Sequence, residues 1–176
     1  METSYWIDER DIIIRTSANW NDFARDNDGA GANAAHIIGR PLRNFIGDDN
    51  TRMWLDAMIQ YVRVSGKSVI RPYRCDSPRE RRFMEMEIRP EADGSLCLRH
   101  LVLRVEERAE PYDFSFGAKK FASSLSRCSV CNRVSADGTW LEVEDFIRLY
   151  NRGRMEVSHD VCPDCRNNLP AGRQIP

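Results

Sequence analysis

The sequence predicts an α+β fold followed by a small cysteine-rich module. Strand and helix patterns fill the chain up to about residue 108, one long amphipathic helix lies among them, and two Cys-x-x-Cys motifs follow in the last third. A chain of 176 residues is long enough for one ordinary domain and a small appendage. We therefore expect a first domain at residues 1–108, a connector at 109–127 and a metal-binding module at 128–176.

The first domain begins with two strands and several short helices. Residues 5–8 and 12–14 have strand character on either side of a turn. Asn19 is a suitable N-cap for a short helix after them. Residues 34–46 form an irregular helical stretch, interrupted by Gly39-Arg40-Pro41.

One long helix and three strands complete the predicted domain. Polar residues at 48–51 can cap the helix, and Gly66 can end it. Apolar residues recur between them at helical spacing: Met53, Trp54, Ala57, Met58, Tyr61 and Val62. Residues 69–74, 84–89 and 96–105 have strand patterns, and a hairpin turn at 92–95 joins the last two.

This order of elements resembles the PAS domain family. The similarity is carried by Trp20-Asn21-Asp22-Phe23-Ala24 and by Ile38-Gly39-Arg40-Pro41-Leu42-Arg43-Asn44-Phe45-Ile46, and it covers residues 5–108. It implies a five-stranded antiparallel sheet with helices on one face. The segments 74–78 and 81–85, with a C-terminal Cys-x-x-Cys…His-x-x-Cys-x-x-Cys pattern, resemble a bacterial subgroup of this family. The family senses small ligands or binds partner proteins in signal transduction.

A ligand cavity is expected between the long helix and the sheet. Apolar positions at helix and strand periods must face one another, and methionines suit an adaptable pocket. A solid core without room for a ligand is the alternative. His100 is a candidate haem ligand or a core histidine. The predicted lining is Phe45, Trp54, Met58 and Tyr61 on the helical side, and Met84, Met86, Leu98 and His100 on the strands.

The two Cys-x-x-Cys motifs predict a structural zinc site. Cys128, Cys131, Cys162 and Cys165 supply the four thiolates of a tetrahedral Zn²⁺ site, although the spacer at 132–161 is longer than usual. Free thiols, a redox pair, disulfides and an iron site of the rubredoxin type are the alternatives. His159 can replace one cysteine, hydrogen-bond a thiolate or lie on the surface. A short helix at 143–150 is expected between the motifs.

Composition and charge indicate a soluble cytoplasmic protein. The N-terminus lacks the basic start and apolar core of a signal peptide, and no apolar run is long enough to span a bilayer. The net charge is −1, and residues 127–176 carry seven basic and seven acidic residues. Neither value favours phosphate binding, so nucleic acid is not the expected partner.

The expected function is non-enzymatic. The sequence contains three histidines, and no catalytic triad motif, P-loop or dinucleotide fingerprint is recognisable in it. We expect a sensor or adaptor that binds a small ligand or a protein. A transcription-linked regulator that contacts DNA through the cysteine module is the alternative. A homodimer is also expected, because connector aromatics offer apolar surface: Tyr112, Phe114, Phe116 and Phe121.

Overall fold

The computed structural model describes residues 1–26, 30–47, 49–109, 111–116, 125–150, 154–167 and 173–174. The chain forms two compact units, each assembled from separate segments. The first unit comprises Met1–Pro72, Met84–Leu103 and Gly172–Pro176, and the second comprises Tyr73–Phe83 and Arg104–Ala171. The division into a domain at residues 1–108, a connector at 109–127 and a module at 128–176 stays a prediction.

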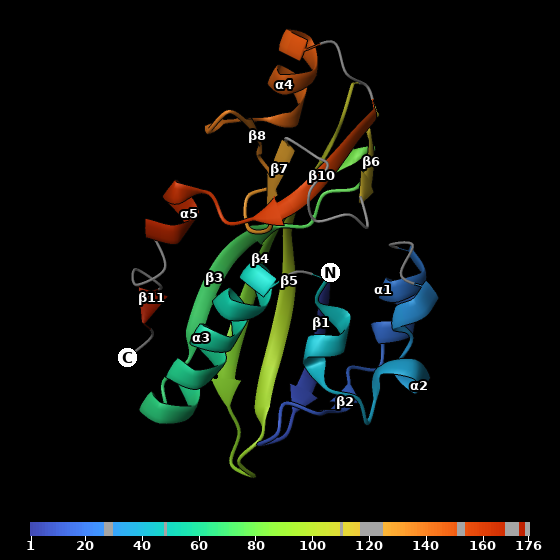
Figure 1. Cartoon of the computed structure of the whole chain (residues 1–176). Helices are drawn as coiled ribbons and strands as arrows, with labels where there is room; N and C mark the ends of the chain where they lie inside the picture. Colours follow the sequence, from blue (N-terminus) through green and yellow to red (C-terminus); the bar gives the residue numbers. More distant parts are fainter. Residues whose placement is uncertain are drawn as a thin grey trace. The chain divides into compact units, whose positions relative to one another are not determined.

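The first unit is built on an antiparallel sheet. The predicted strands are present as β1 (Glu2–Ile7), β2 (Ile13–Thr16), β3 (Val69–Arg74), β4 (Glu80–Pro90) and β5 (Leu96–Glu107). Their order is β3-β4-β5-β1-β2, so the first strand of the chain pairs with the fifth (Figure 1). The short strand β11 (Arg173–Gln174) adds to β3 in antiparallel register.

All helices of the first unit lie between β2 and β3 in the chain. They are α1 (Trp20–Asp26), η1 (Ala30–Ala32), α2 (Ala34–Ile37), η2 (Leu42–Phe45) and the long α3 (Asp49–Ser65). Asn33 caps α2, because its side chain accepts the backbone N–H of His36 at 3.0 Å. Asn19 directly precedes α1, and its carbonyl accepts the Phe23 N–H at 3.1 Å, while its side-chain amide donates to the Glu2 carbonyl at 2.7 Å. Gly66, with φ of 66°, ends α3 as predicted.

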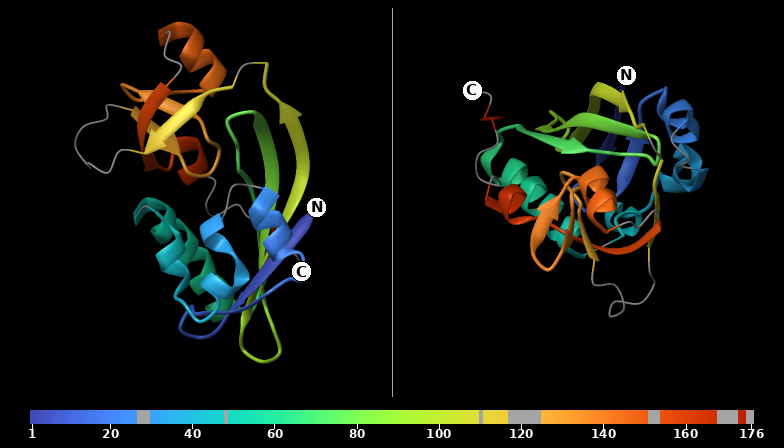
Figure 2. Two further views of the ribbon diagram at one scale, coloured as in Figure 1. Left: turned by 90° about the vertical axis from the view of Figure 1, so that its right-hand side faces the viewer. Right: turned by 90° about the horizontal axis from the view of Figure 1, so that it is seen from above.

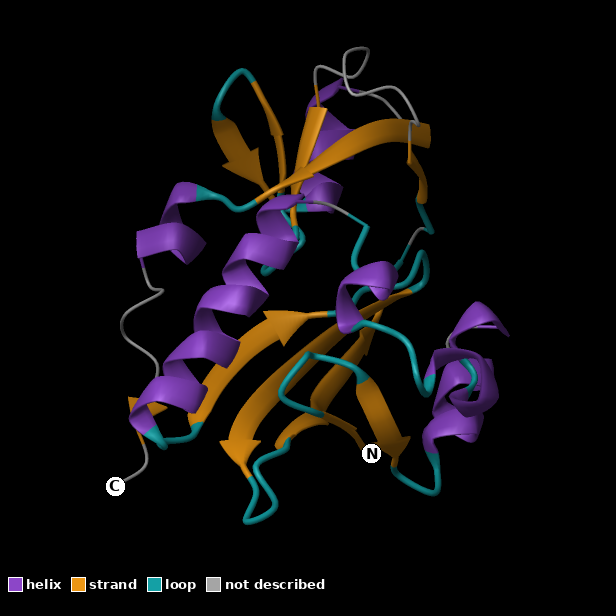
Figure 3. Ribbon diagram, turned by 60° about the horizontal axis from the view of Figure 1, so that its bottom comes forward, coloured by secondary structure: helices purple, strands orange, loops and turns teal. Residues whose placement is uncertain are grey.

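The core of the first unit lies between α3 and one face of the sheet. In both views of Figure 2, and in Figure 3, α3 lies along one side of the strands. The predicted helix face needs correction, because Met53 is 70% exposed and Tyr61 is 38% exposed. The helix buries a neighbouring stripe at the same spacing. This stripe is Leu55, Met58, Ile59 and Val62, and it accompanies the buried strand residues Ile7, Met84, Met86, Ile88, Leu96 and Leu98.

The second unit contains a mixed sheet covered by one helix. Its elements are β6 (Asp113–Phe116), β7 (Leu125–Cys128), β8 (Val134–Ala136), β9 (Thr139–Leu141), α4 (Val143–Tyr150), β10 (Arg154–Asp160) and α5 (Pro163–Asn167). The strand order is β6-β10-β7-β8-β9, with β10 parallel to β6 and β7. The bounds of α4 are those that the sequence predicted.

A small apolar core joins α4 to this sheet. Phe146 and Val143 of α4 are fully buried, and the buried strand residues beside them are Leu125, Val134 and Val157. Tyr112, from the predicted connector, belongs to the same core and is 4% exposed. Phe121 lies outside the described residues. A core of this size gives limited hydrophobic stabilisation, so other interactions must contribute to the stability of this unit.

Candidate metal centre

The first cysteine motif forms a tight turn at the end of β7. Cys128 is the last residue of this strand, and its backbone N–H donates to the Arg133 carbonyl at 2.8 Å. The Asn132 N–H donates back to the Cys128 carbonyl at 2.9 Å, and Asn132 has a left-handed φ of 61°. Asparagine tolerates this conformation better than most residues. The turn therefore presents Cys128 and Cys131 on the same side.

The second motif lies at the same end of the neighbouring strand. Cys162 follows β10, and Cys165 lies in α5, whose Arg166 N–H donates to the Cys162 carbonyl at 2.9 Å. Strand β10 runs parallel to β7 with Asp160 opposite Cys128. Because parallel strands end at the same edge of a sheet, the two motifs meet although 30 residues separate them in the sequence.

The four sulfur atoms have the spacing of a tetrahedral site. The Sγ atoms of Cys128, Cys131, Cys162 and Cys165 all lie within 4.8 Å of one another. The Sγ atoms of Cys131 and Cys162 are 3.7 Å apart. A Zn–S distance of about 2.3 Å places tetrahedral sulfurs about 3.8 Å apart. The predicted ligand set is thus brought together, and its chemistry suits zinc or iron.

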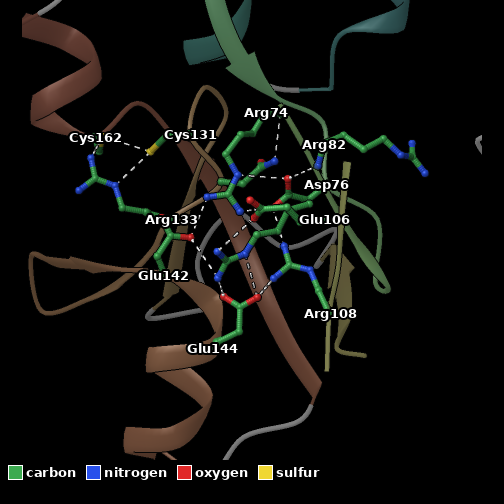
Figure 4. Close-up of polar contacts among 12 residues, drawn as sticks. Arg74, Asp76, Arg82, Glu106, Arg108, Cys131, Arg133, Glu142, Glu144 and Cys162 are labelled. Carbon is green, nitrogen blue, oxygen red and sulfur yellow. Dashed lines mark hydrogen bonds and ion pairs between the residues drawn. The ribbon is translucent and has the colours of Figure 1, made fainter. Parts of the chain in front are cut away.

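Hydrogen-bond donors surround these thiols. The Cys162 backbone N–H donates to the Cys128 sulfur at 3.4 Å, and the Cys165 N–H donates to the Cys162 sulfur at 3.5 Å. Arg133 donates to the sulfurs of Cys131 and Cys162 at 3.3 and 3.5 Å (Figure 4). Four thiolates around a divalent ion carry a net charge of −2, and Arg133 offsets part of it. The sequence analysis did not identify Arg133.

The thiols also differ in acidity. Hydrogen bonds from Cys128, Cys165 and Arg133 lower the pKa of Cys131 well below its usual range. The hydrogen bond with Cys131 raises the pKa of Cys128 to about 11. Cys131 and Cys165 are partly exposed, while Cys128 and Cys162 are fully buried.

His159 lies near the end of β10 and contacts the first cysteine turn. Its Nδ1 atom is 3.3 Å from the hydroxyl of Ser129, in the turn of the first motif. Four cysteines already supply four ligands, so the geometry assigns His159 no ligand position.

The predicted pocket residues divide into two groups in the first unit. Met58, Met84, Met86 and Leu98 are buried in its core. Phe45, Trp54 and His100 are half-buried, while Tyr61 is exposed. A ligand cavity in this place stays a prediction.

His100 belongs to an aromatic cluster in the first unit. Its ring stacks on Tyr5 at 5.5 Å between centroids, and Tyr5 meets Trp20 edge to face at 5.7 Å. Burial lowers the pKa of His100 to about 4. The imidazole is therefore neutral at physiological pH, and it gains a proton on unfolding below its ordinary pKa of 6.5.

This pKa predicts a loss of stability in mild acid. Between pH 6.5 and pH 4 the unfolded state binds the proton and the folded state does not, so the free energy of unfolding falls as pH falls. We expect His100 to account for about 2 kcal/mol of the decrease between pH 7 and pH 5. Urea unfolding of wild type and His100→Gln at both pH values measures this. The free energy of unfolding of His100→Gln should depend less on pH than that of wild type, whereas the exposed-site control His36→Gln should behave like wild type. If all three proteins show the same pH dependence, His100 is not its source.

The second unit also contains a cluster of charged side chains around the buried Asp76, which we call the Asp76 cluster. Its members are Arg81 and five residues labelled in Figure 4: Arg74, Asp76, Arg108, Glu142 and Glu144. The Asp76 side chain is fully buried, as Arg108 nearly is, and the Arg108 Nη2–Asp76 Oδ2 distance is 2.6 Å. Arg74 also contacts Asp76, and it reaches Glu142 at 2.7 Å. The Arg108 guanidinium lies 4.4 Å from the centre of the Tyr112 ring.

Backbone hydrogen bonds join this cluster to the first cysteine turn. The Arg74 N–H donates to the Val130 carbonyl at 2.7 Å, and the Asn132 side chain donates to the Arg74 carbonyl at 3.0 Å. Arg74 is therefore fixed by its side chain to Asp76 and by its backbone to the cysteine turn. Two stabilising sites of the second unit are thus directly connected.

Two further findings concern membrane spans and similar proteins. In the part of the chain that the structure describes, no helix combines the length and the apolar character that crossing a membrane requires. Compared with models of protein families and with curated proteins, the sequence matches none of them.

Proposed function

We propose that this chain is a non-enzymatic sensor or adaptor of the PAS type, acting in bacterial signal transduction by binding a small ligand or a protein. The observation that carries the proposal is the first unit's arrangement of two strands, a helical segment and three strands in one antiparallel sheet. The residues that resemble PAS domains lie in this arrangement. The half-buried Trp54 and the buried methionines Met58, Met84 and Met86 give it an adaptable apolar interior.

The cysteine cluster acts in this proposal as a structural zinc site. Four cysteine ligands leave no open coordination position for water or substrate, which distinguishes structural sites from catalytic ones. The small apolar core of the second unit supports a stabilising role for the metal. Iron is the alternative, because tetrahedral thiolates also bind it.

A DNA-binding regulator is the weaker alternative. Phosphate binding needs cations that are available at the surface. In the second unit, Arg74, Arg81 and Arg108 are engaged with carboxylates, and Arg133 contacts Asp164 at 2.7 Å. These pairs favour a small ligand or a protein as the partner.

Native mass spectrometry of the purified protein, with an absorption spectrum, tests this proposal. We expect about one Zn²⁺ per chain, a colourless protein and a small-molecule mass that denaturation releases. Red colour would identify ferric tetrathiolate, and a Soret band would identify haem on a histidine such as His100. A native mass equal to that of the chain plus zinc would contradict small-ligand sensing and leave protein binding as the proposed function. If the protein contains no metal after purification under reducing conditions with zinc supplied, the zinc-site prediction is wrong. The native mass spectrum also shows whether the expected homodimer forms.

A further inference from the structure

The sheet of the second unit has one face that packs against α4 and an opposite face that carries a row of polar residues. On the polar face, residues directly opposite one another form a row across four strands: Ser158 beside Ser126, Ser126 beside Ser135, and Ser135 beside Trp140. Partners in register project to the same side of a sheet. The alternate residues, such as Val134 and Val157, project to the other side and join the core with α4. Trp140 therefore lies on the side of the sheet away from α4.

This polar face is hollowed. The hollow has a volume of about 300 Å³, at the lower end of the range for small-ligand sites. Ser126 and Ser135 are much smaller than Trp140 beside them, which leaves space on this face of the sheet. In Figure 1 the β8–β9 hairpin and α5 both lie to the left of β10. The lining residues are Ser126, Ser135, Asp137, Gly138, Trp140, Asp160, Val161, Pro163 and Arg166.

The hairpin turn places a carboxylate at this hollow. Asp137 and Gly138 have φ values of 58° and 86°. Positive φ at both central residues is the requirement of the tight two-residue turn that matches strand twist. Asp137 is exposed at this turn and also lines the hollow. Its position is therefore set by the backbone of the hairpin.

The charges of the hollow favour a cation. Asp137 and Asp160 contribute two negative charges, and Arg166 contributes one positive charge, which lies 3.5 Å from Asp160. The Arg166 guanidinium also donates to the Val161 carbonyl at 3.1 Å. Tryptophan attracts cations to its ring face more strongly than other aromatic residues do. Serine hydroxyls can accept hydrogen bonds from an ammonium group.

From these features we infer that the hollow is a binding site for an alkylammonium group, supplied by a small amine or by a lysine side chain. The apolar chain of such a ligand would lie against Trp140, and its charged end would face the carboxylates. All lining residues of this site belong to the second unit, and the inference does not depend on the PAS proposal. Val161 and Pro163 flank Cys162, so the experiment uses the full chain with its metal bound.

The test is a titration followed by ¹H–¹⁵N NMR of the uniformly labelled protein. The sequence contains four tryptophans, whose indole N–H signals are resolved individually, and Trp140→Phe identifies the Trp140 signal. n-Butylammonium chloride at constant ionic strength should shift that signal and the Gly138 amide saturably. The other three indole signals should stay in place. Absence of a saturable shift at Trp140 in the millimolar range overturns the inference.

Neutral ligands test whether the charge is recognised. 1-Butanol has the same number of heavy atoms as n-butylammonium and no charge, and it should produce no saturable shift. Glucose tests the alternative of a carbohydrate site, which also combines tryptophan with polar groups. Equal or tighter binding of butanol or glucose overturns the inference. A peptide with one central lysine, compared with its norleucine analogue, distinguishes a lysine side chain from a free amine as the source.

Charge-neutralising variants locate the site. Asp160→Asn keeps an oxygen that can accept the Val161 N–H, which Asp160 now accepts at 2.7 Å. It should raise the concentration for half-saturation by about fivefold. Asp137→Asn is a second variant whose exposed turn position leaves folding intact, and Asp145→Asn on α4 is the matched control. Unchanged binding in Asp137→Asn, or an equal loss in Asp145→Asn, overturns the assignment.

Discussion

Cys162→Ser is expected to release the metal and unfold the second unit. The Cys162 sulfur is fully buried, is a member of the four-sulfur cluster and accepts hydrogen bonds from Cys165 and Arg133. Zinc-finger-like sites contribute on the order of 10 kcal/mol to folding. A small apolar core cannot replace such a contribution. We expect metal content near zero and collapse of the second unit's amide signals in ¹H–¹⁵N spectra.

The first unit should remain folded in this variant. Its core is formed by α3 and the sheet and includes Ile88 and Leu98, whose signals should persist. Cys75→Ser is the matched control, because Cys75 also lies in the second unit but is not a member of the cluster. It should keep full metal content. Full metal content and an unchanged spectrum in Cys162→Ser would show that the cluster is not a metal site.

Sequence patterns were sufficient where the signal is local. The helix at Val143–Tyr150 was predicted with its observed bounds, because its apolar spacing lies within one element. Each cysteine pair is likewise contained in one turn. The long spacer between the pairs is explained by β8, β9, α4 and β10, which return the chain parallel to β7.

Contacts between residues distant in sequence were not predictable in the same way. Helix α3 has apolar residues on more than one side, so periodicity alone did not exclude Met53 or Tyr61 from the packed face. Arg133 was missed because an arginine near a cysteine motif has no distinctive pattern. The Asp76 cluster joins three segments that are distant in sequence, at residues 74–81, 108 and 142–144. Only the fold brings their charges together.

Removal of the Asp76 charge is expected to destabilise the second unit strongly. Asp76 is the fully buried anion between Arg74 and Arg108, and it also accepts the Arg82 backbone N–H at 3.2 Å. Asp76→Asn keeps the size of the side chain but leaves two buried cations without this partner. Breaking a buried ion pair from one side costs about 3–5 kcal/mol. Native-state hydrogen exchange of amides in β7, β8 and β10 should show that the free energy of unfolding of the second unit falls by this amount.

An exposed pair provides the control for this prediction. Asp145 contacts Arg148 at 2.8 Å on the surface of α4, and such pairs contribute about 0–1 kcal/mol. Asp145→Asn should therefore leave exchange nearly unchanged. The double variant Asp76→Asn/Arg108→Gln also removes one of the cations that Asp76→Asn leaves uncompensated. Its loss of unfolding free energy should therefore be smaller than the sum of the losses in the two single variants. If Asp76→Asn exchanges like Asp145→Asn, then Asp76 does not anchor the cluster, and the Arg74 contacts to Glu142 and to the cysteine turn are sufficient to hold it.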